Sequence, residues 1–539
     1  MKKQYIRLIA FVLALMLALT GCSGVDEYFS FLGSMLAGTV PLTHFDDMEY
    51  TRPDISEFQS LQAECSRLAE EGGDFDALEE NIYLLFEEYY DFSTNYALAN
   101  IHYCIDTTDL YWSDEYYYCL DLSDEVSTAM EQLSYVLAAS EFRETLESDE
   151  FFGPDYFDDY DGKNYFDDTF SAMLDEESAL LNTYYELNNQ LLSADYGSAA
   201  YLTLAEDMAD LYAELISLRR QQSEYAGFDT YADFAYDYYY SRDYTPTQEA
   251  AYLEQLKAEL VPLYRQVCTE GVDGAEYKFT REETTFEYVR DAATAMGGVI
   301  EDAFTRMEEA GLYHISYGEN KYNASFETYL ISYYEPFIFI NPSQDSYDKL
   351  TFAHEFGHFC NEYASYGSML GIDAMEIFSQ GMEYLSLLYC EDTEDLAKLK
   401  LFDSLCTYVE QAAYADFERQ AHLLPEEELT GENLIALFEE VTTQYGFDLW
   451  HVDGRDFVTV PHFFISPMYV FSYVVSNDAA MQIYQLELAE SGSGLQVYMD
   501  NLSSEEAQFL AFLESAGLES PFADGRLATV RKTFENALT

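Results

Sequence analysis

Two histidines four residues apart constrain the fold of this chain more than any other feature of its sequence. The segment 350–359 reads LTFAHEFGHF, which places Glu355 directly after His354 and Gly357 directly before His358. Residues four apart share one face of an α-helix, so on a helix both imidazoles can bind the same cation. The sequence therefore predicts a helix here with a metal site on one face.

The residue types in this segment suit hydrolytic chemistry. Neutral imidazole is a good zinc ligand, and catalytic zinc keeps one position for water or substrate. A neighbouring carboxylate can take a proton from the attacking water and pass it to a leaving amine, which is the role we expect of Glu355. Such a pattern arises by chance in about one chain in a hundred of this composition. Gly357 costs its helix about 1 kcal/mol relative to alanine, which indicates close packing at the metal or a crowded core.

A zinc site of this kind needs a third protein ligand, and the next apolar segment offers two. Residues 373–383 read DAMEIFSQGME and contain Glu376 and Glu383. Spacing alone does not choose between these two carboxylates, and either one could instead be an ordinary surface glutamate.

The two segments together resemble the thimet oligopeptidase and oligoendopeptidase F family of zinc peptidases. In that family the histidine helix is followed by a glutamate ligand in an E-x-x-S-Q-x-x-E pattern. The resemblance implies that Glu376 is the third ligand and that the chain binds one Zn²⁺. The remaining positions of the pattern are Ser379, Gln380 and Glu383.

Two further residues of this segment bear on the comparison with the family. Asp373 stands where the family has an acidic group, and the resemblance implies that it orients a ligand imidazole. Phe378 stands where many members have proline, a departure that concerns helix geometry more than chemistry.

A second resemblance lies nearer the C-terminus. Residues 462–473 read HFFISPMYVFSY, similar to the H-F-x-x-x-P-x-Y-V-x-x-Y run of the oligoendopeptidase F branch. It implies that His462, Tyr469 and Tyr473 bind substrate and stabilise the oxyanion, because an imidazole or phenol can donate to that oxygen. The chain has 50 tyrosines, so ordinary core or surface positions are the alternative. A weaker match, over 218–231, resembles the family's helix and turn before the catalytic region.

Apolar residues recur at helical spacing from about residue 51 to about residue 240, as in Leu78, Ile82, Leu85 and Tyr89. A further helix is predicted from Thr245, which can form a capping box with Gln248. Its predicted buried stripe consists of Leu253, Leu256, Leu260 and Leu263.

Strand signals are few. The best is the apolar run 336–340, bounded by prolines, which we expect either at the edge of a small sheet, where it could pair with an extended peptide, or in the core.

These patterns predict a mainly α protein. The resemblance implies a large two-lobed helical zincin-type peptidase, with a small β-sheet edge near the active site and a deep substrate channel. Along the chain we expect a lipoprotein signal peptide (1–22), a tether (23–50), an N-terminal helical region (51–244) and a catalytic region (245–539).

The first residues predict export and lipid anchoring. Basic residues precede an apolar stretch, residues 9–19, that is too short to span a bilayer comfortably. The stretch ends in Leu19-Thr20-Gly21-Cys22, which resembles the lipobox of bacterial lipoproteins. A diacylated Cys22 would hold the protein at a membrane surface. We therefore expect an extracytoplasmic, lipid-anchored protein, with an ordinary secretory signal as the alternative.

The charge of the chain restricts its partners. It has 25 basic and 101 acidic residues, a formal net charge of −76 at pH 7, which argues against nucleic acid and anionic lipid. The seven other cysteines lack the spacing of a disulfide framework, although Cys104 and Cys119 could bridge. We expect a monomer with short peptides as partners.

The sequence thus predicts a zinc-dependent metalloendopeptidase that hydrolyses short peptides. Two alternatives remain: a carboxypeptidase or dipeptidase on a related helical fold, and a catalytically silent peptide-binding lipoprotein.

Overall fold

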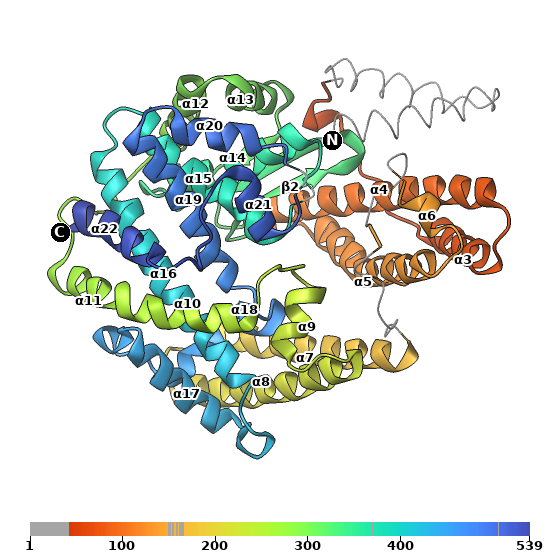
Figure 1. Cartoon of the computed structure of the whole chain (residues 1–539), viewed down its shortest axis with the longest axis horizontal. Coiled ribbons are helices and arrows are strands. Elements are labelled where there is room, and N and C mark those ends of the chain that lie inside the picture. Colours follow the sequence, from red (N-terminus) through yellow and green to blue (C-terminus); the bar gives the residue numbers. More distant parts are fainter. Residues whose placement is uncertain are drawn as a thin grey trace. The chain divides into compact units, whose positions relative to one another are not determined.

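The computed structural model describes residues 42–148, 152, 156–157, 160, 167–368, 370–504 and 506–539. Over these residues the chain consists mainly of α-helices with one small sheet, as Figure 1 shows, and the predicted fold class is confirmed. The predicted signal peptide with Cys22 and most of the predicted tether lie outside the described residues. Within the described ranges, no helix combines the length and apolar character that crossing a membrane requires.

The chain divides into two compact units, and each unit draws on several stretches of sequence. The first comprises the described parts of 1–164, 297–344 and 359–368, and the second those of 165–296, 345–358 and 369–539. The predicted ranges 51–244 and 245–539 follow the order of the chain instead, and they remain predictions.

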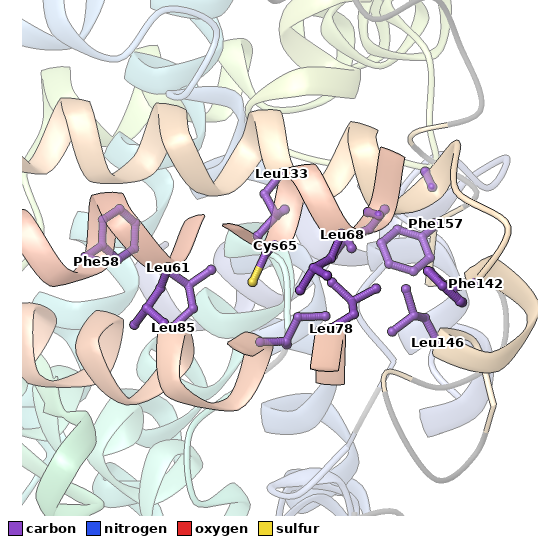
Figure 2. Close-up of a cluster of buried hydrophobic side chains, with 14 of the residues drawn as sticks. Phe58, Leu61, Cys65, Leu68, Leu78, Leu85, Leu133, Phe142, Leu146 and Phe157 are labelled. Atoms are coloured by element: carbon purple, nitrogen blue, oxygen red, sulfur yellow. The ribbon is translucent and has the colours of Figure 1, made fainter. Parts of the chain in front are cut away.

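Three long helices that pack on one another form the body of the first unit. Leu78, Ile82 and Leu85 are buried at the predicted helical spacing, and Tyr89 packs partly buried against them. Figure 2 shows this apolar cluster, in which Phe58 and residues from several helices meet. Among its described residues, this unit has the helices α3 (Ser56–Glu71), α4 (Phe75–Ile105), α5 (Leu110–Ala138), α6 (Arg143–Leu146) and α13 (Gly298–Ala310).

The described strands form one three-stranded sheet in the first unit, in the order β1-β3-β2. β1 (Tyr313–Ile315) runs parallel to β3 (Glu335–Ile340), and β2 (Ser325–Leu330) runs antiparallel to it. The apolar run 336–340 is therefore the central strand and not an edge, and every residue of β3 is buried. Of the two alternatives for this run, the core strand is confirmed, and the edge strand that could pair with a peptide was wrong, because both edges of β3 already bond to neighbouring strands.

The second unit consists of helices. They are α7 (Asp168–Leu192), α8 (Ala199–Ala226), α9 (Tyr231–Tyr238), α10 (Pro246–Glu259), α11 (Val261–Glu270), α12 (Glu282–Met296), α15 (Ile372–Tyr389), α16 (Glu394–Ala421), α17 (Gly431–Gln444), α18 (Pro461–Ile465), α19 (Phe471–Ala489), α20 (Ser493–Asn501), α21 (Phe509–Ala516) and α22 (Arg526–Leu538). Helix α14 (Asp348–Ser365) has residues in both units. Short 3-10 helices occupy Phe45–Asp47, Ile331–Tyr333, Glu426–Glu428, Phe447–Trp450 and Gly454–Thr459.

Helix α10 begins as the sequence predicts, with a complete capping box between Thr245 and Gln248. The predicted stripe of four leucines, however, is divided between two helices. α10 ends at Glu259, with Leu260 as its C-cap, and α11 has Pro262 in its first turn. A proline lacks the N–H that would continue the first helix, so the chain restarts there.

Candidate active site

Three side chains from two helices of the second unit form the candidate metal site. His354 and His358 lie one turn apart on α14, and Glu376 lies on α15. The Nε2 atoms of His354 and His358 are 3.5 and 3.8 Å from the same oxygen, Oε2 of Glu376. The ligand atoms of all three residues lie within 4.8 Å of one another. The structure thus brings the three predicted ligands together.

The spacing and chemistry of these groups fit one zinc ion. Tetrahedral zinc with nitrogen and oxygen ligands at about 2.0–2.2 Å separates its ligand atoms by about 3.3–3.6 Å. The observed separations are close to that range. Two imidazoles and a carboxylate are also an established donor set for catalytic zinc, and they leave a fourth position for water or substrate. His354, His358 and Glu376 would hold the ion.

Glu383 supports the site from the other side of His354. Its Oε1 lies 3.0 Å from Nδ1 of His354, which leaves Nε2 of that ring for Glu376 and the metal. Its second oxygen pairs with Lys400 on α16 at 2.8 Å. The two carboxylates thus differ in position: Glu376 faces both Nε2 atoms, as a third ligand would, whereas Glu383 bonds Nδ1 of His354 and can orient that ring.

The charges of this cluster shift the pKa values of its members. Burial acts to lower the pKa of His354. The hydrogen bond with Glu383 and the charge of Glu376 act more strongly in the other direction and raise this pKa to about 9. Loss of solvent lowers the pKa of His358 to about 4, which favours the neutral ring. Burial acts to raise the pKa of Glu383, but Lys400 and His354 hold it below its ordinary value. Glu383 is therefore an anion that accepts from both neighbours.

Asp373 does not orient a ligand imidazole, so that expectation was wrong. Its carboxylate pairs with Nε of Arg242 at 3.1 Å and accepts from the hydroxyl of Tyr244 at 2.6 Å. Asp373 lies in the first turn of α15, three residues before Glu376, and Arg242 and Tyr244 occupy its carboxylate.

Gly357 allows α14 and α15 to approach closely beside the ligands. A methyl group at this position would lie 2.3 Å from the carbonyl oxygen of Phe378 and 2.6 Å from Cα of Ser379. The sequence predicted close packing at this glycine, and the contact with the backbone of α15 explains it. Ser379 in turn donates to Oε2 of Glu376 at 2.9 Å, so the same contact region fixes the carboxylate.

Glu355 is buried on α14 next to the first histidine. Its charge acts on His354 and also on Tyr473, so the carboxylate lies within the same group of side chains. This is the neighbourhood that a general base for the attacking water requires.

His462, Tyr469 and Tyr473 form one aromatic cluster beside Glu376. The ring of His462 stacks on Tyr469 with centroids 5.5 Å apart, and Tyr469 meets Tyr473 edge to face at 5.2 Å. The hydroxyl of Tyr469 lies 3.5 Å from Oε1 of Glu376. The structure therefore places all three residues predicted for substrate binding at the candidate metal site.

Both tyrosines of this cluster are held in the neutral form. Burial, with the charge of Glu376 as a second cause, raises the pKa of Tyr473 to about 12 and the pKa of Tyr469 further above its usual range. Burial lowers the pKa of His462. Neutral phenols are hydrogen-bond donors, as stabilisation of an oxyanion requires.

Comparison with known proteins agrees with this geometry. Residues 45–163 match the family model of the peptidase M3 N-terminal domain. Oligopeptidase PepF of Bacillus subtilis (strain 168) is 26% identical over 204 residues, which cover 34% of this chain and 30% of PepF. The chain thus shares sequence similarity with the peptidase M3 N-terminal domain and with PepF. The match to PepF spans less than a third of that protein's length.

Solved structures show the same fold over nearly the whole chain. A structure of PZ peptidase A with an inhibitor has a TM-score of 0.77 at 20% identity, covering 91% of this chain and 98% of the other. A candidate oligoendopeptidase F from Bacillus anthracis str. Ames has a TM-score of 0.75 at 20% identity, covering 92% and 98%. The match to the peptidase M3 N-terminal domain covers residues 45–163. In that region the sequence prediction rests on helical spacing and on no family motif.

Lys400 is the contributor to the site that sequence reasoning missed. It is a buried lysine between two buried leucines, Leu399 and Leu401, on a helix of a chain with few basic residues. A cation at such a position needs a buried anion as partner. A lysine between two leucines on a helix is therefore the sequence feature that could have indicated a buried ion pair.

Proposed function

We propose that this chain is a zinc-dependent metalloendopeptidase that hydrolyses short peptides. The observation that carries the proposal is the convergence of Nε2 of His354 and His358 on one oxygen of Glu376, with Glu355 beside them. The relationship to the oligoendopeptidase F peptidases supports the same reading.

The residues of the site have distinct parts in the proposed reaction. Bound zinc would polarise the scissile carbonyl and make water more acidic. Glu355 takes the proton of the attacking water and later delivers it to the leaving amine. Tyr469 and Tyr473, as neutral phenols, and His462 donate to the substrate and to the oxygen on which negative charge develops.

We also propose that the enzyme is anchored outside the cytoplasmic membrane through Cys22. The support is the sequence alone: a basic start, a short apolar stretch and a Leu19-Thr20-Gly21-Cys22 lipobox. A diacyl group supplies enough buried methylenes to retain a folded domain at the membrane.

The central experiment uses an internally quenched peptide that is blocked at both ends, so that only internal cleavage gives a signal. The zinc-loaded protein is expected to cleave it, a chelator to abolish cleavage, and added zinc to restore it. Glu355→Gln is expected to keep its zinc and lose turnover by at least about 100-fold. Glu440→Gln, which changes an exposed carboxylate on α17, is the matched control and should behave like the wild type.

Three outcomes would contradict the proposal in different ways. Full activity of Glu355→Gln would remove the general base from its role. Trimming of peptides with free ends, without cleavage of the blocked peptide, would favour a carboxypeptidase or dipeptidase. Equilibrium binding of peptide by the zinc-loaded protein without any cleavage would instead indicate a binding protein.

A further inference from the structure

The segment 461–473 carries the three substrate-binding candidates and is held by two buried arginines. It runs from α18 into the first turn of α19. Arg219 on α8 and Arg242, between α9 and α10, have almost no exposed side-chain surface. Both lie in the same compact unit as the candidate site.

Arg219 holds the backbone directly after His462. Its Nη1 donates to the carbonyl of Phe463 at 2.8 Å, and its Nη2 donates to the carbonyl of Phe464. Its Nε donates to Glu177 on α7 at 2.7 Å, and Glu177 is itself bonded by Gln222. The guanidinium therefore fixes the last turn of α18 against α7 and α8.

Arg242 connects both sides of Tyr469 with the helix that carries Glu376. Its Nη1 donates to the carbonyl of Met468 at 3.0 Å, and its Nη2 donates to the hydroxyl of Ser472 at 2.8 Å. The same guanidinium pairs with Asp373 in the first turn of α15. The guanidinium of Arg242 thus links the segment 461–473 to α15, the helix that carries Glu376.

The backbone of this segment is strained where Arg242 holds it. Met468 has a φ of 63°, a left-handed conformation that costs free energy for a residue with a side chain. Its carbonyl accepts from Arg242, and its N–H donates to the buried carboxylate of Glu418. The preceding carbonyl, of Pro467, accepts from Tyr240 at 2.7 Å. Strain of this kind persists where surrounding groups enforce it, typically at functional sites.

A general stabilising role does not account for this arrangement. Buried ion pairs add little net stability, because loss of hydration offsets their attraction. Arg526 and Asp478 form a comparable pair at 2.7 Å in the same unit, and Arg526 donates to Asp478 and Gln485, which lie on α19 beyond Tyr473. The arginines at 219 and 242 differ because their bonds end on the backbone and side chains that flank His462 and Tyr469.

We propose that Arg219 and Arg242 are positioning residues that fix His462, Tyr469 and Tyr473 relative to Glu376 in peptide hydrolysis. This inference rests on the proposed peptidase function. The two residues act through the segment they hold and do not contact the substrate.

The test compares Arg219→Lys and Arg242→Lys with the matched control Arg526→Lys. Lysine keeps the charge but cannot make the forked bonds of a guanidinium. For each variant, kcat and KM on the blocked peptide, zinc content and thermal unfolding are measured. We expect kcat to fall about 10- to 100-fold in the first two variants with zinc content unchanged, because a small misplacement of a reacting group has this effect. The Arg526→Lys control should keep its kcat even if its Tm falls.

A double-mutant cycle separates positioning from a diffuse structural effect. If Arg242 acts through Tyr469, then Arg242→Lys should lower kcat little further in a Tyr469→Phe background. Additive losses in the cycle, or a kcat of both arginine variants equal to that of the wild type, would overturn the inference. Absence of cleavage by the wild type would instead overturn the proposed function.

If the arginine variants do not fold, Ser472→Ala tests whether Arg242 positions the segment 461–473. It removes one hydrogen bond from Arg242 and leaves both buried charges in place. A fall in kcat of about fivefold, the equivalent of one such bond, would support the inference, and an unchanged kcat would overturn it.

Discussion

At the scale of single residues, the site depends on the carboxylate behind the first histidine. Glu383 bonds Nδ1 of His354 and is held by Lys400. Partners of this kind fix the tautomer of a ligand ring and raise its basicity. We therefore expect Glu383→Gln to weaken zinc binding about 10- to 100-fold in a competition titration with a zinc-binding dye. An affinity equal to that of the exposed control Glu440→Gln would contradict this role.

A second residue-scale prediction concerns the buried carboxyl of Glu418. Burial raises its pKa to about 8, although the N–H of Met468 and the charge of Arg219 act the other way. Between the ordinary value of 4.5 and about 8, the folded protein holds this proton and the unfolded chain does not. The contribution of Glu418 to the free energy of unfolding therefore falls as pH rises through this window.

Glu418→Gln removes this ionisation. The variant should gain stability relative to the wild type as pH rises from 5 to 8, by on the order of a few kcal/mol. Denaturant unfolding at both pH values measures the difference. A stability difference that does not change with pH would show that Glu418 ionises normally in the fold.

The cluster of His354, His358 and Glu376 could be predicted from the sequence because the spacing of these residues is local to two helices. The choice of Glu376 over Glu383 came from the family pattern, and the structure shows its physical basis in the face of α15 that each occupies. The partner of Asp373 could not be predicted, because Arg242 lies 131 residues away in the chain. Lys400 was missed because its contact with Glu383 depends on how α16 packs on α15.

At the scale of elements, the contact between α14 and α15 sets the geometry of the ligands. An added methyl at Gly357 would meet backbone atoms of α15, which cannot move without shifting the helix. Gly357→Ala should therefore destabilise the protein by about 1–3 kcal/mol and weaken zinc binding, despite the better helix propensity of alanine.

Gly381→Ala is the matched control for this variant. Gly381 also lies within α15, but its added methyl would meet side chains only, at 3.2 Å or more. Thermal unfolding and zinc titration of both variants check the prediction. Equal effects of the two substitutions on stability and zinc binding would show that these properties do not depend on the close approach of α14 and α15.

Most elements could be predicted from apolar spacing and capping, and the errors have local causes. The composition of the run 336–340 suits an edge strand and a central strand equally. It is central because β1 pairs with one of its edges and β2 with the other. The leucine stripe beyond residue 253 kept its helical spacing across a break at Pro262. Hydrophobic periodicity alone does not reveal such a break between two helices, whereas the presence of a proline indicates it.

At the scale of the whole molecule, the acidic composition bears on the proposed anchor. A net charge of −76 disfavours close association with anionic lipid, so the proposed retention at a membrane would depend on the acyl chains. We expect Cys22→Ser to move the protein from the membrane fraction to the soluble fraction without loss of peptidase activity. Membrane retention of this variant, followed by immunoblotting of the fractions, would contradict lipid anchoring at this cysteine.

The most direct test of the metal site is anomalous diffraction at the zinc absorption edge from crystals of the zinc-loaded protein. The account predicts one strong peak per chain, at about 2.0–2.2 Å from Nε2 of His354, Nε2 of His358 and a carboxylate oxygen of Glu376. A peak bound by other residues, or no peak between α14 and α15, would contradict it.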